Sequence, residues 1–220
     1  MIMLVLSCDK NKDLFEPFYK CMEKYYPEHP EIIYLTETIK NQYYKTICKN
    51  YSLELWTKRV RETLKEIDDD KILLMMDDNF IRQPVDIDRI KYVEDNLKGN
   101  IAMFNFEKVF DNRDEDCEYI GFKKRNKSGI VLPSIMCGMW QKDKLATVLN
   151  ITCQPWEIER LNIAHDFDYY INSCDYIIDY GYEFQKPFGI TKGKWAREIV
   201  PFFEKEGIEI DYSMRGFYEK

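Results

Sequence analysis

The chain has 220 residues, of which 45% are hydrophobic and 15% aromatic, and its net charge at pH 7 is −7. This length is enough for one sizeable hydrophobic core, so we expect a single domain that spans residues 1–220. The acidic balance argues against nucleic acid as a partner, because binding to a phosphate backbone needs a basic face.

Cysteine usage and hydropathy bear on where the protein works. The seven cysteines never form a CxxC pair and never neighbour a histidine, so they fit reduced thiols better than a disulfide framework or a zinc site. No apolar segment is as long as a membrane span, and the N-terminal run turns polar too early for a signal peptide. We therefore expect a cytoplasmic protein with no transmembrane segment. Any membrane contact would be peripheral, through basic and aromatic residues near the C-terminus.

The chain opens with the strand, loop and helix of an α/β unit. Met1–Leu6 and Glu31–Leu35 are strand-like, and a helical pattern that ends near Tyr25 separates them. The loop after the first strand holds Ser7 and Asp9, which we expect at the carboxyl edge of the sheet, where they could hydrogen-bond a nucleotide base or ribose. Asp9 has an alternative role as a cap of the following helix.

The next segment contains the first candidate for a phosphate contact. Residues Thr36–Tyr51 are polar and aromatic and predict a loop with a short helix, whereas Ser52–Asp68 has apolar residues at helical spacing. Its charged face is typical of solvated surface. Of the basic residues there, Arg59 is the one that we expect to reach a diphosphate.

A buried strand that ends in oxygen-bearing side chains is the strongest site signal. Ile72–Met76 is a continuous apolar run, and Asp77, Asp78 and Asn79 follow it. Such side chains could hold Mg²⁺ or Mn²⁺, which prefer oxygen ligands, or they could simply form a turn or cap a helix. A second acidic cluster, Asp68–Asp70, precedes the strand and therefore predicts a solvated turn at the opposite end.

Alternation of strands and helices then continues before it breaks down. Asp86–Lys98 predicts a helix and Asn100–Phe106 the next strand. Asp111–Asn126 carries many charges of both signs and predicts an excursion with a short hairpin. The second half of the chain does not repeat the first.

Two carboxylates in the second half are candidate bases. After Ile130–Trp140 and a short helical segment, Pro155–Ala164 predicts a helix with Glu157 and Glu159 near its start. Residues two apart cannot face the same way on a helix, so only one should point into a cleft. Ordinary compensation of the helix dipole is the alternative role for both.

The last third offers a histidine and a basic loop. His165 lies beside acidic residues, and we expect it to be solvated or at the core edge rather than a metal ligand. Asp175–Tyr182 predicts a late strand and turn. Glycines surround Lys192 and Lys194 ahead of a helix that runs to about Glu206. This loop could close over phosphates, although it lacks the spacing of a P-loop.

Together these features resemble those of nucleotide-diphospho-sugar glycosyltransferases of the GT-A fold, specifically the bacterial transferases of surface-polysaccharide clusters. The resemblance spans nearly the whole chain. It rests on the first strand and its Ser7-Cys8-Asp9 loop, on Asp77-Asp78-Asn79, on Pro155-Trp156-Glu157-Ile158-Glu159 and on Gly193-Lys194-Trp195.

The resemblance implies an α/β, GT-A-like single domain with a mostly parallel central sheet flanked by helices. Residues 1–107 would form the nucleotide-sugar-binding half and residues 108–220 an irregular acceptor half. The family binds a divalent metal, Mn²⁺ or Mg²⁺, through a DxD motif, which implies Asp78 and Asn79 as ligands here with Asp77 beside the donor; Asn79 departs from the motif by replacing the second acid.

The remaining implied roles complete a transfer site. Ser7 and Asp9 would hold the base, and Arg59, Lys192 and Lys194 the diphosphate. Either Glu157 or Glu159 would be the general base. These roles describe transfer of a sugar from a nucleoside-diphosphate donor to a saccharide or lipid-linked acceptor, with inversion at the anomeric carbon.

Two other readings remain open. A metal-dependent nucleotidyltransferase would also place carboxylates at a strand end, and a catalytically inactive nucleotide- or sugar-binding module would explain Asn79. An NAD-dependent oxidoreductase is disfavoured, because no GxGxxG motif follows the first strand.

Overall fold

The computed structural model describes residues 1–108, 112–127, 134–161, 165–181 and 189–219. Within them one mixed sheet holds nine strands in the order β3-β2-β1-β4-β8-β5-β9-β7-β6. The strands are β1 (Ile2–Leu6), β2 (Ile32–Thr36), β3 (Lys45–Cys48), β4 (Lys71–Met76), β5 (Ile101–Asn105), β6 (Glu115–Asp116), β7 (Phe122–Lys124), β8 (Gly138–Gln141) and β9 (Asp168–Asn172). A separate hairpin joins β10 (Ile190–Thr191) to β11 (Lys194–Trp195).

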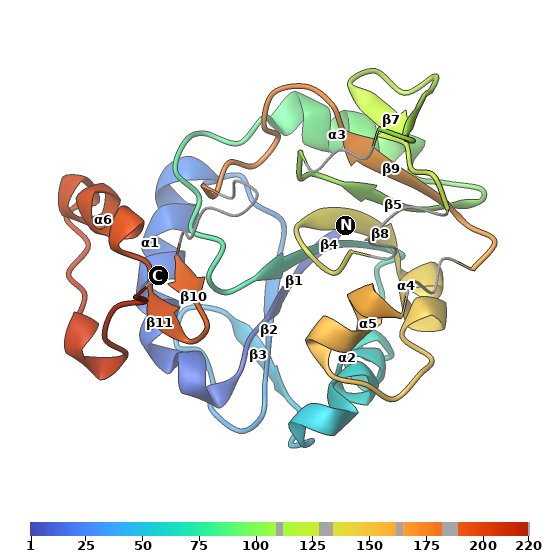
Figure 1. The fold of residues 1–220 in the computed structure, drawn as a ribbon. Helices are drawn as coiled ribbons and strands as arrows, with labels where there is room; N and C mark the ends of the chain where they lie inside the picture. Colours follow the sequence, from blue (N-terminus) through green and yellow to red (C-terminus); the bar gives the residue numbers. More distant parts are fainter. Residues whose placement is uncertain (109–111, 128–133, 162–164, 182–188, 220) are drawn as a thin grey trace.

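Helices cover both faces of this sheet, and Figure 1 shows α2, α4 and α5 grouped across the sheet from α3. The α-helices are α1 (Phe15–Tyr25), α2 (Trp56–Leu64), α3 (Ile87–Asn96), α4 (Lys142–Val148), α5 (Pro155–Arg160) and α6 (Val200–Glu206). Short 3-10 helices are η1 (Asp9–Leu14), η2 (Leu53–Leu55), η3 (Arg197–Ile199) and η4 (Tyr212–Met214). The predicted α/β architecture with a mostly parallel, helix-flanked sheet is confirmed.

The apolar runs of the sequence become strands that are buried on both faces. Along β4, Leu73 and Met75 belong to one core cluster, whereas Ile72 and Leu74 belong to the other. This division follows from the alternation of side chains along a strand. The continuous apolar pattern therefore arises because each face of the sheet packs against its own layer of helices.

The chain direction within the sheet sets where the strand ends meet. β1 pairs in parallel with β2 and β4, and β5 pairs in parallel with β9. β8 runs antiparallel between β4 and β5, so these two strands share one direction and end at the same edge of the sheet. The second half of the chain thus adds β6 to β9 to the sheet that the first half begins.

Three predicted segments differ from the structure. Lys45–Cys48 lies in the predicted loop but forms β3, a half-buried edge strand with no apolar pattern to reveal it. The late strand expected at Asp175–Tyr182 is instead β9 at Asp168–Asn172, which pairs with β5 and β7. The loop around Lys192 is a hairpin turn rather than an open loop.

Parts of several predicted segments lie outside the described residues. They are Asp111, the residues 130–133 of the predicted Ile130–Trp140 segment, residues 162–164 at the end of the predicted Pro155–Ala164 helix, and Tyr182. Within the described residues that helix is α5, Pro155–Arg160.

Candidate functional site

Asp77, Asp78 and Asn79, here called the acidic trio, lie where the sequence predicts them, directly after β4 at the carboxyl edge of the sheet. β1 ends beside it, because Leu6 pairs with Met76 and the Asp77 N–H donates to the Leu6 carbonyl at 3.3 Å. The other acidic cluster, Asp68–Asp70, precedes β4 and so lies at the opposite end of the strand. Only Asp77-Asp78-Asn79 therefore meets the loop after β1.

Asp77 is buried and both of its carboxylate oxygens accept hydrogen bonds. Ser7 Oγ donates to Oδ2 at 2.5 Å, and Asn11 Nδ2 donates to Oδ1 at 3.0 Å. Burial, followed by repulsion from Asp78, raises the pKa of Asp77 above its ordinary value, while the two hydrogen bonds oppose that rise. Asp77 is thus a carboxylate held in one orientation by the first loop.

Asp78 is half-buried; its carboxylate accepts a hydrogen bond from its own backbone N–H, and the Arg215 charge also stabilises its ionised form. Burial raises its pKa, because the charged form loses hydration there. A divalent cation would restore favourable electrostatics to such a group. Asp78 therefore has the chemistry of a metal ligand.

The Asn79 side chain is hydrogen-bonded to the backbone. Its side-chain oxygen accepts a hydrogen bond from the Met76 N–H at 2.8 Å, which closes the turn after β4. Within the described part of the chain, no three His, Cys, Asp or Glu side chains come together as a metal site. A metal at this edge would have few protein ligands, as Mg²⁺ often has when substrate phosphates complete its shell.

Asp9 joins two loops instead of capping η1. Its carboxylate accepts hydrogen bonds from the Thr38 N–H, the Ile39 N–H and Thr38 Oγ1, at 2.5 to 2.9 Å. The alternative role of Asp9 as a helix cap is therefore not seen, and η1 has no side-chain hydrogen bond at its N-cap. Asp9 shapes the surface where the first two strands end.

Arg59 reaches the same corner from α2. Its buried guanidinium forms an ion pair with Glu37, and Nη2 donates to the Ser7 carbonyl at 3.1 Å. Glu37 in turn accepts a hydrogen bond from the Asp9 N–H at 2.6 Å. In this structure Arg59 therefore links α2 to the loops after β1 and β2.

The C-terminal hairpin packs directly against the acidic trio. A Cβ atom on Gly189 would lie 2.9 Å from the Asp78 carbonyl oxygen, so the two backbones are in contact. Lys192 and Gly193 both have positive φ, which is the signature of the tight turn that joins β10 to β11. The Lys192 ammonium lies over the Tyr218 ring at 5.5 Å, and Lys194 is exposed.

The two candidate bases on α5 have different surroundings. Glu157 is exposed, and its carboxylate accepts a hydrogen bond from the Gln154 N–H at 2.8 Å as part of a capping box. Glu159 is half-buried and accepts from the Ile135 N–H at 3.2 Å and from Ser134 Oγ at 3.4 Å. Burial raises the pKa of Glu159.

Glu107 is a candidate site residue that the sequence did not reveal. It follows β5, is buried, and accepts a 2.5 Å hydrogen bond from Tyr180 Oη. Burial raises its pKa to about 7; repulsion from Glu159 adds to the rise, and the Tyr180 hydrogen bond opposes it. Its position two residues after an apolar strand is the signal that could have identified it.

Glu107 and Glu159 lie at the same edge of the sheet as Asp77 and Asp78. Gly138 at the start of β8 pairs with Leu74 of β4 on one side and with Asn105 of β5 on the other. Only β8 thus separates β4 from β5, at two interstrand spacings or about 10 Å. A Cβ atom on Gly138 would lie 2.7 Å from the Phe104 carbonyl oxygen, which explains the glycine at this position.

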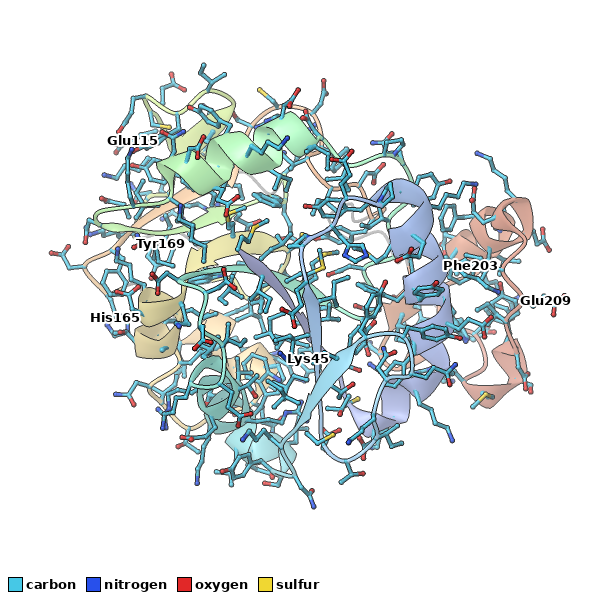
Figure 2. All side chains as sticks on the ribbon, turned by 180° about the vertical axis from the view of Figure 1, so that it is seen from behind. Lys45, Glu115, His165, Tyr169, Phe203 and Glu209 are labelled. Carbon is cyan, nitrogen blue, oxygen red and sulfur yellow. The ribbon has the colours of Figure 1, made fainter. Side chains whose placement is uncertain are left out.

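His165 lies away from this edge. It is exposed and precedes β9, at the amino end of that strand. Figure 2 shows it at the periphery of the molecule, on the opposite side of the view from Phe203. The expectation that His165 is solvated is confirmed.

No protein-family model and no curated protein matches the sequence. Among solved structures, similarity is found to a nucleotidyl transferase from Methanothermobacter, with 12% identity over 79% of this chain and 88% of that one and a TM-score of 0.48. The glycosyltransferase GlyE of Streptococcus pneumoniae has 10% identity over 96% of this chain and 61% of its own, with a TM-score of 0.49.

The bifunctional IspDF of Campylobacter jejuni has 13% identity and a TM-score of 0.43, covering 79% of this chain. This chain spans 49% of the length of that protein. Similarities at this level do not assign the chain to a family. No helix in the described ranges is both long and apolar enough to cross a membrane.

Proposed function

We propose that the protein is a glycosyltransferase of the GT-A type, which moves a sugar from a nucleoside-diphosphate donor to a hydroxyl of a saccharide or lipid-linked acceptor. One observation carries the proposal. Two half-buried carboxylates, Asp78 and Glu159, belong to segments that meet at one edge of the sheet. The first suits the donor diphosphate and its metal, and the second suits the acceptor.

The donor side would be built on the loops after β1, β2 and β4. The Ser7-Cys8-Asp9 loop is rigidly held by Asp9 and Arg59, which suits recognition of a base or ribose. Asp78 would hold Mn²⁺ or Mg²⁺. Asp77 and Asn79, on either side of it in the chain, are held by hydrogen bonds within the protein. The bound metal would supply positive charge against the diphosphate oxygens. Lys192 and Lys194 on the hairpin would add charge of the same sign.

The acceptor side would use Glu159 as the general base. Its carboxylate takes the proton from the acceptor hydroxyl as the oxygen attacks the anomeric carbon, and the bond to the diphosphate breaks with its electron pair. Such a displacement inverts the anomeric configuration. A raised pKa suits this role, since a base works best when its pKa is near the operating pH.

Isothermal calorimetry with UDP, GDP and CMP, each with and without Mn²⁺, tests the donor site. One nucleotide should bind, more tightly with Mn²⁺. Asp78→Asn should weaken that binding about tenfold or more, because a contact to a charged group is worth about 1.5 to 3 kcal/mol. The control is Asp68→Asn, which removes an exposed carboxylate from the other end of β4 and should bind as the wild type does.

Failure has distinct meanings. Binding of no nucleotide would overturn the donor site altogether. Nucleotide binding with no sugar transfer or donor hydrolysis, unchanged in Glu159→Gln, would favour the binding module. Release of pyrophosphate from a nucleoside triphosphate would favour the nucleotidyltransferase. A transferred sugar that keeps the donor's anomeric configuration, read by NMR, would exclude Glu159 as the base of an inverting reaction.

A further inference from the structure

A chain of hydrogen bonds runs from the C-terminal segment, residues 212–219, to the buried carboxylate of Asp77. It begins at Arg215, which follows η4. The Arg215 guanidinium binds Asp13, with Nε donating to Oδ2 at 2.7 Å, and Nη2 donates to the Lys10 carbonyl at 2.9 Å. Nη2 also donates to Asn11 Oδ1 at 3.0 Å. Arg215 is therefore held firmly in contact with η1.

The contact with Arg215 decides which way the Asn11 amide points. A guanidinium has only donors, so the side-chain oxygen of Asn11 must face it. The Nδ2 group is then directed at Asp77 Oδ1, to which it donates at 3.0 Å. Ser7 Oγ holds the other oxygen of the same carboxylate. Both oxygens of Asp77 are thus fixed, one of them through a residue that Arg215 orients.

The C-terminal segment is also tied to the hairpin that touches Asp78. The Trp195 N–H donates to the Gly216 carbonyl at 3.0 Å, and the Tyr218 N–H donates to the Trp195 carbonyl at 2.9 Å. Gly189, at the start of that hairpin, lies against the Asp78 backbone. In Figure 1 the C-terminus lies beside β10 and α1. The segment is thus linked to both aspartates, to Asp77 through the Asn11 side chain and to Asp78 through the backbone of the hairpin.

We propose that Arg215 is a positioning residue that acts through Asn11 to hold the Asp77 carboxylate in one orientation, so that the C-terminal segment completes the donor site. With Asp77 engaged in this way, Asp78 is the carboxylate left to face a ligand. The effect on nucleotide binding rests on the proposed function. The orientation of Asn11 and Asp77 does not.

The orientation is tested by NMR without any ligand. The side-chain amide signals of Asn11 are assigned by their loss in Asn11→Ala. In Arg215→Met these signals should shift, because the amide loses the partner of its oxygen. The matched control is Arg197→Met, which removes a cation of η3 that contacts the C-terminal segment by pairing with Glu219 at 3.5 Å. Unchanged Asn11 signals in Arg215→Met would overturn the proposal.

The consequence for binding is tested by calorimetry with Mn²⁺ and UDP, GDP and CMP. Arg215→Met and Asn11→Ala should each weaken binding of the preferred nucleotide about tenfold, as loss of residues that orient ligand groups commonly does. The double variant should bind no more weakly than either single one, because both act through one path. Arg197→Met should bind as the wild type does.

A further variant separates orientation from charge. Arg215→Lys keeps the charge but lacks the planar fork that binds Asp13 and Asn11 together, so it should bind as weakly as Arg215→Met. Full rescue by lysine, or additive losses in the double variant, would overturn the positioning role. A wild-type protein that binds none of the nucleotides would overturn the proposed function, and the Asn11 signals would then decide the orientation alone.

Discussion

Glu157 and Glu159 lie two residues apart on α5, and they contact different parts of the molecule. Glu157 accepts a hydrogen bond from the Gln154 N–H within its own helix start, whereas Glu159 accepts one from the Ile135 N–H ahead of β8. Residues two apart on a helix face in nearly opposite directions. The pair therefore provides a reacting candidate and a matched control of the same residue type.

We expect Glu159→Gln to lower the rate of sugar transfer about a hundredfold or more, which is the usual contribution of a general base. Glu157→Gln should leave the rate nearly unchanged and lower the free energy of unfolding by about 1 kcal/mol or less, because it weakens the capping box. Initial rates and urea denaturation of both variants check this. Equal rate losses in the two variants would contradict the assignment of Glu159.

Glu107 should make stability depend on pH. Its pKa is raised to about 7 from an ordinary value of 4.5, so its contribution to stability is fully present below about pH 4.5 and is lost as the pH rises through about 7. Glu107→Gln keeps an acceptor for Tyr180 but never ionises. Relative to the wild type, this variant should gain stability between about pH 5 and about pH 8.5.

Urea denaturation at the two pH values measures this gain. The control is Glu28→Gln, an exposed position where the difference between variant and wild type should stay constant. A wild-type advantage over Glu107→Gln that grows toward high pH would show that Glu107 is stabilised as an anion.

Alanine variants of Gly189 and Gly193 distinguish the stability cost of backbone strain from the cost of contact with Asp78. Both have positive φ, so alanine at either position should cost about 1 kcal/mol. Only at Gly189 would the new Cβ press on the Asp78 carbonyl oxygen, whereas nothing lies within 4 Å of it at Gly193. Gly189→Ala should therefore lose about 1 kcal/mol or more beyond Gly193→Ala.

Thermal and urea unfolding of the two glycine variants give this comparison. Equal losses would mean that the hairpin yields without disturbing Asp78. A larger loss at Gly193 would contradict the packing of the hairpin against the acidic trio.

Arg59 should matter for stability as well as for ligands. Arg59→Met removes the ion-pair partner of Glu37, which keeps only its hydrogen bond from the Asp9 N–H, and we expect a loss in the free energy of unfolding of about 2 kcal/mol. This is less than the roughly 3 to 5 kcal/mol of a fully buried pair, because Glu37 keeps contact with water. Arg61→Met, two residues along α2, removes a more exposed guanidinium and should change stability by about 0.5 kcal/mol or less. Similar values for both would show that the link from α2 to the first loops is weak.

The local sequence pattern was sufficient to predict those elements whose hydrophobic pattern is set by burial. Ile72–Met76 had to form a strand covered on both faces, and the oxygen-bearing residues after it had to lie at the strand's carboxyl end. The opposite orientations of Glu157 and Glu159 also followed from helix geometry. The late strand was misplaced because Asp168–Asn172 and Asp175–Tyr182 have similar compositions, and pairing with β5 and β7 selects the first.

The sequence by itself thus determined the α/β class, the buried strands and the position of Asp77 and Asp78, because hydrophobic periodicity and strand direction are local properties. Only the tertiary structure decided which polar groups meet. Arg215 reaches Asn11 across 204 residues, and Glu107 gains its environment from Tyr180, 73 residues later. Such partners depend on how segments far apart in the sequence pack at the edge of the sheet, and no local sequence pattern specifies which segments meet there.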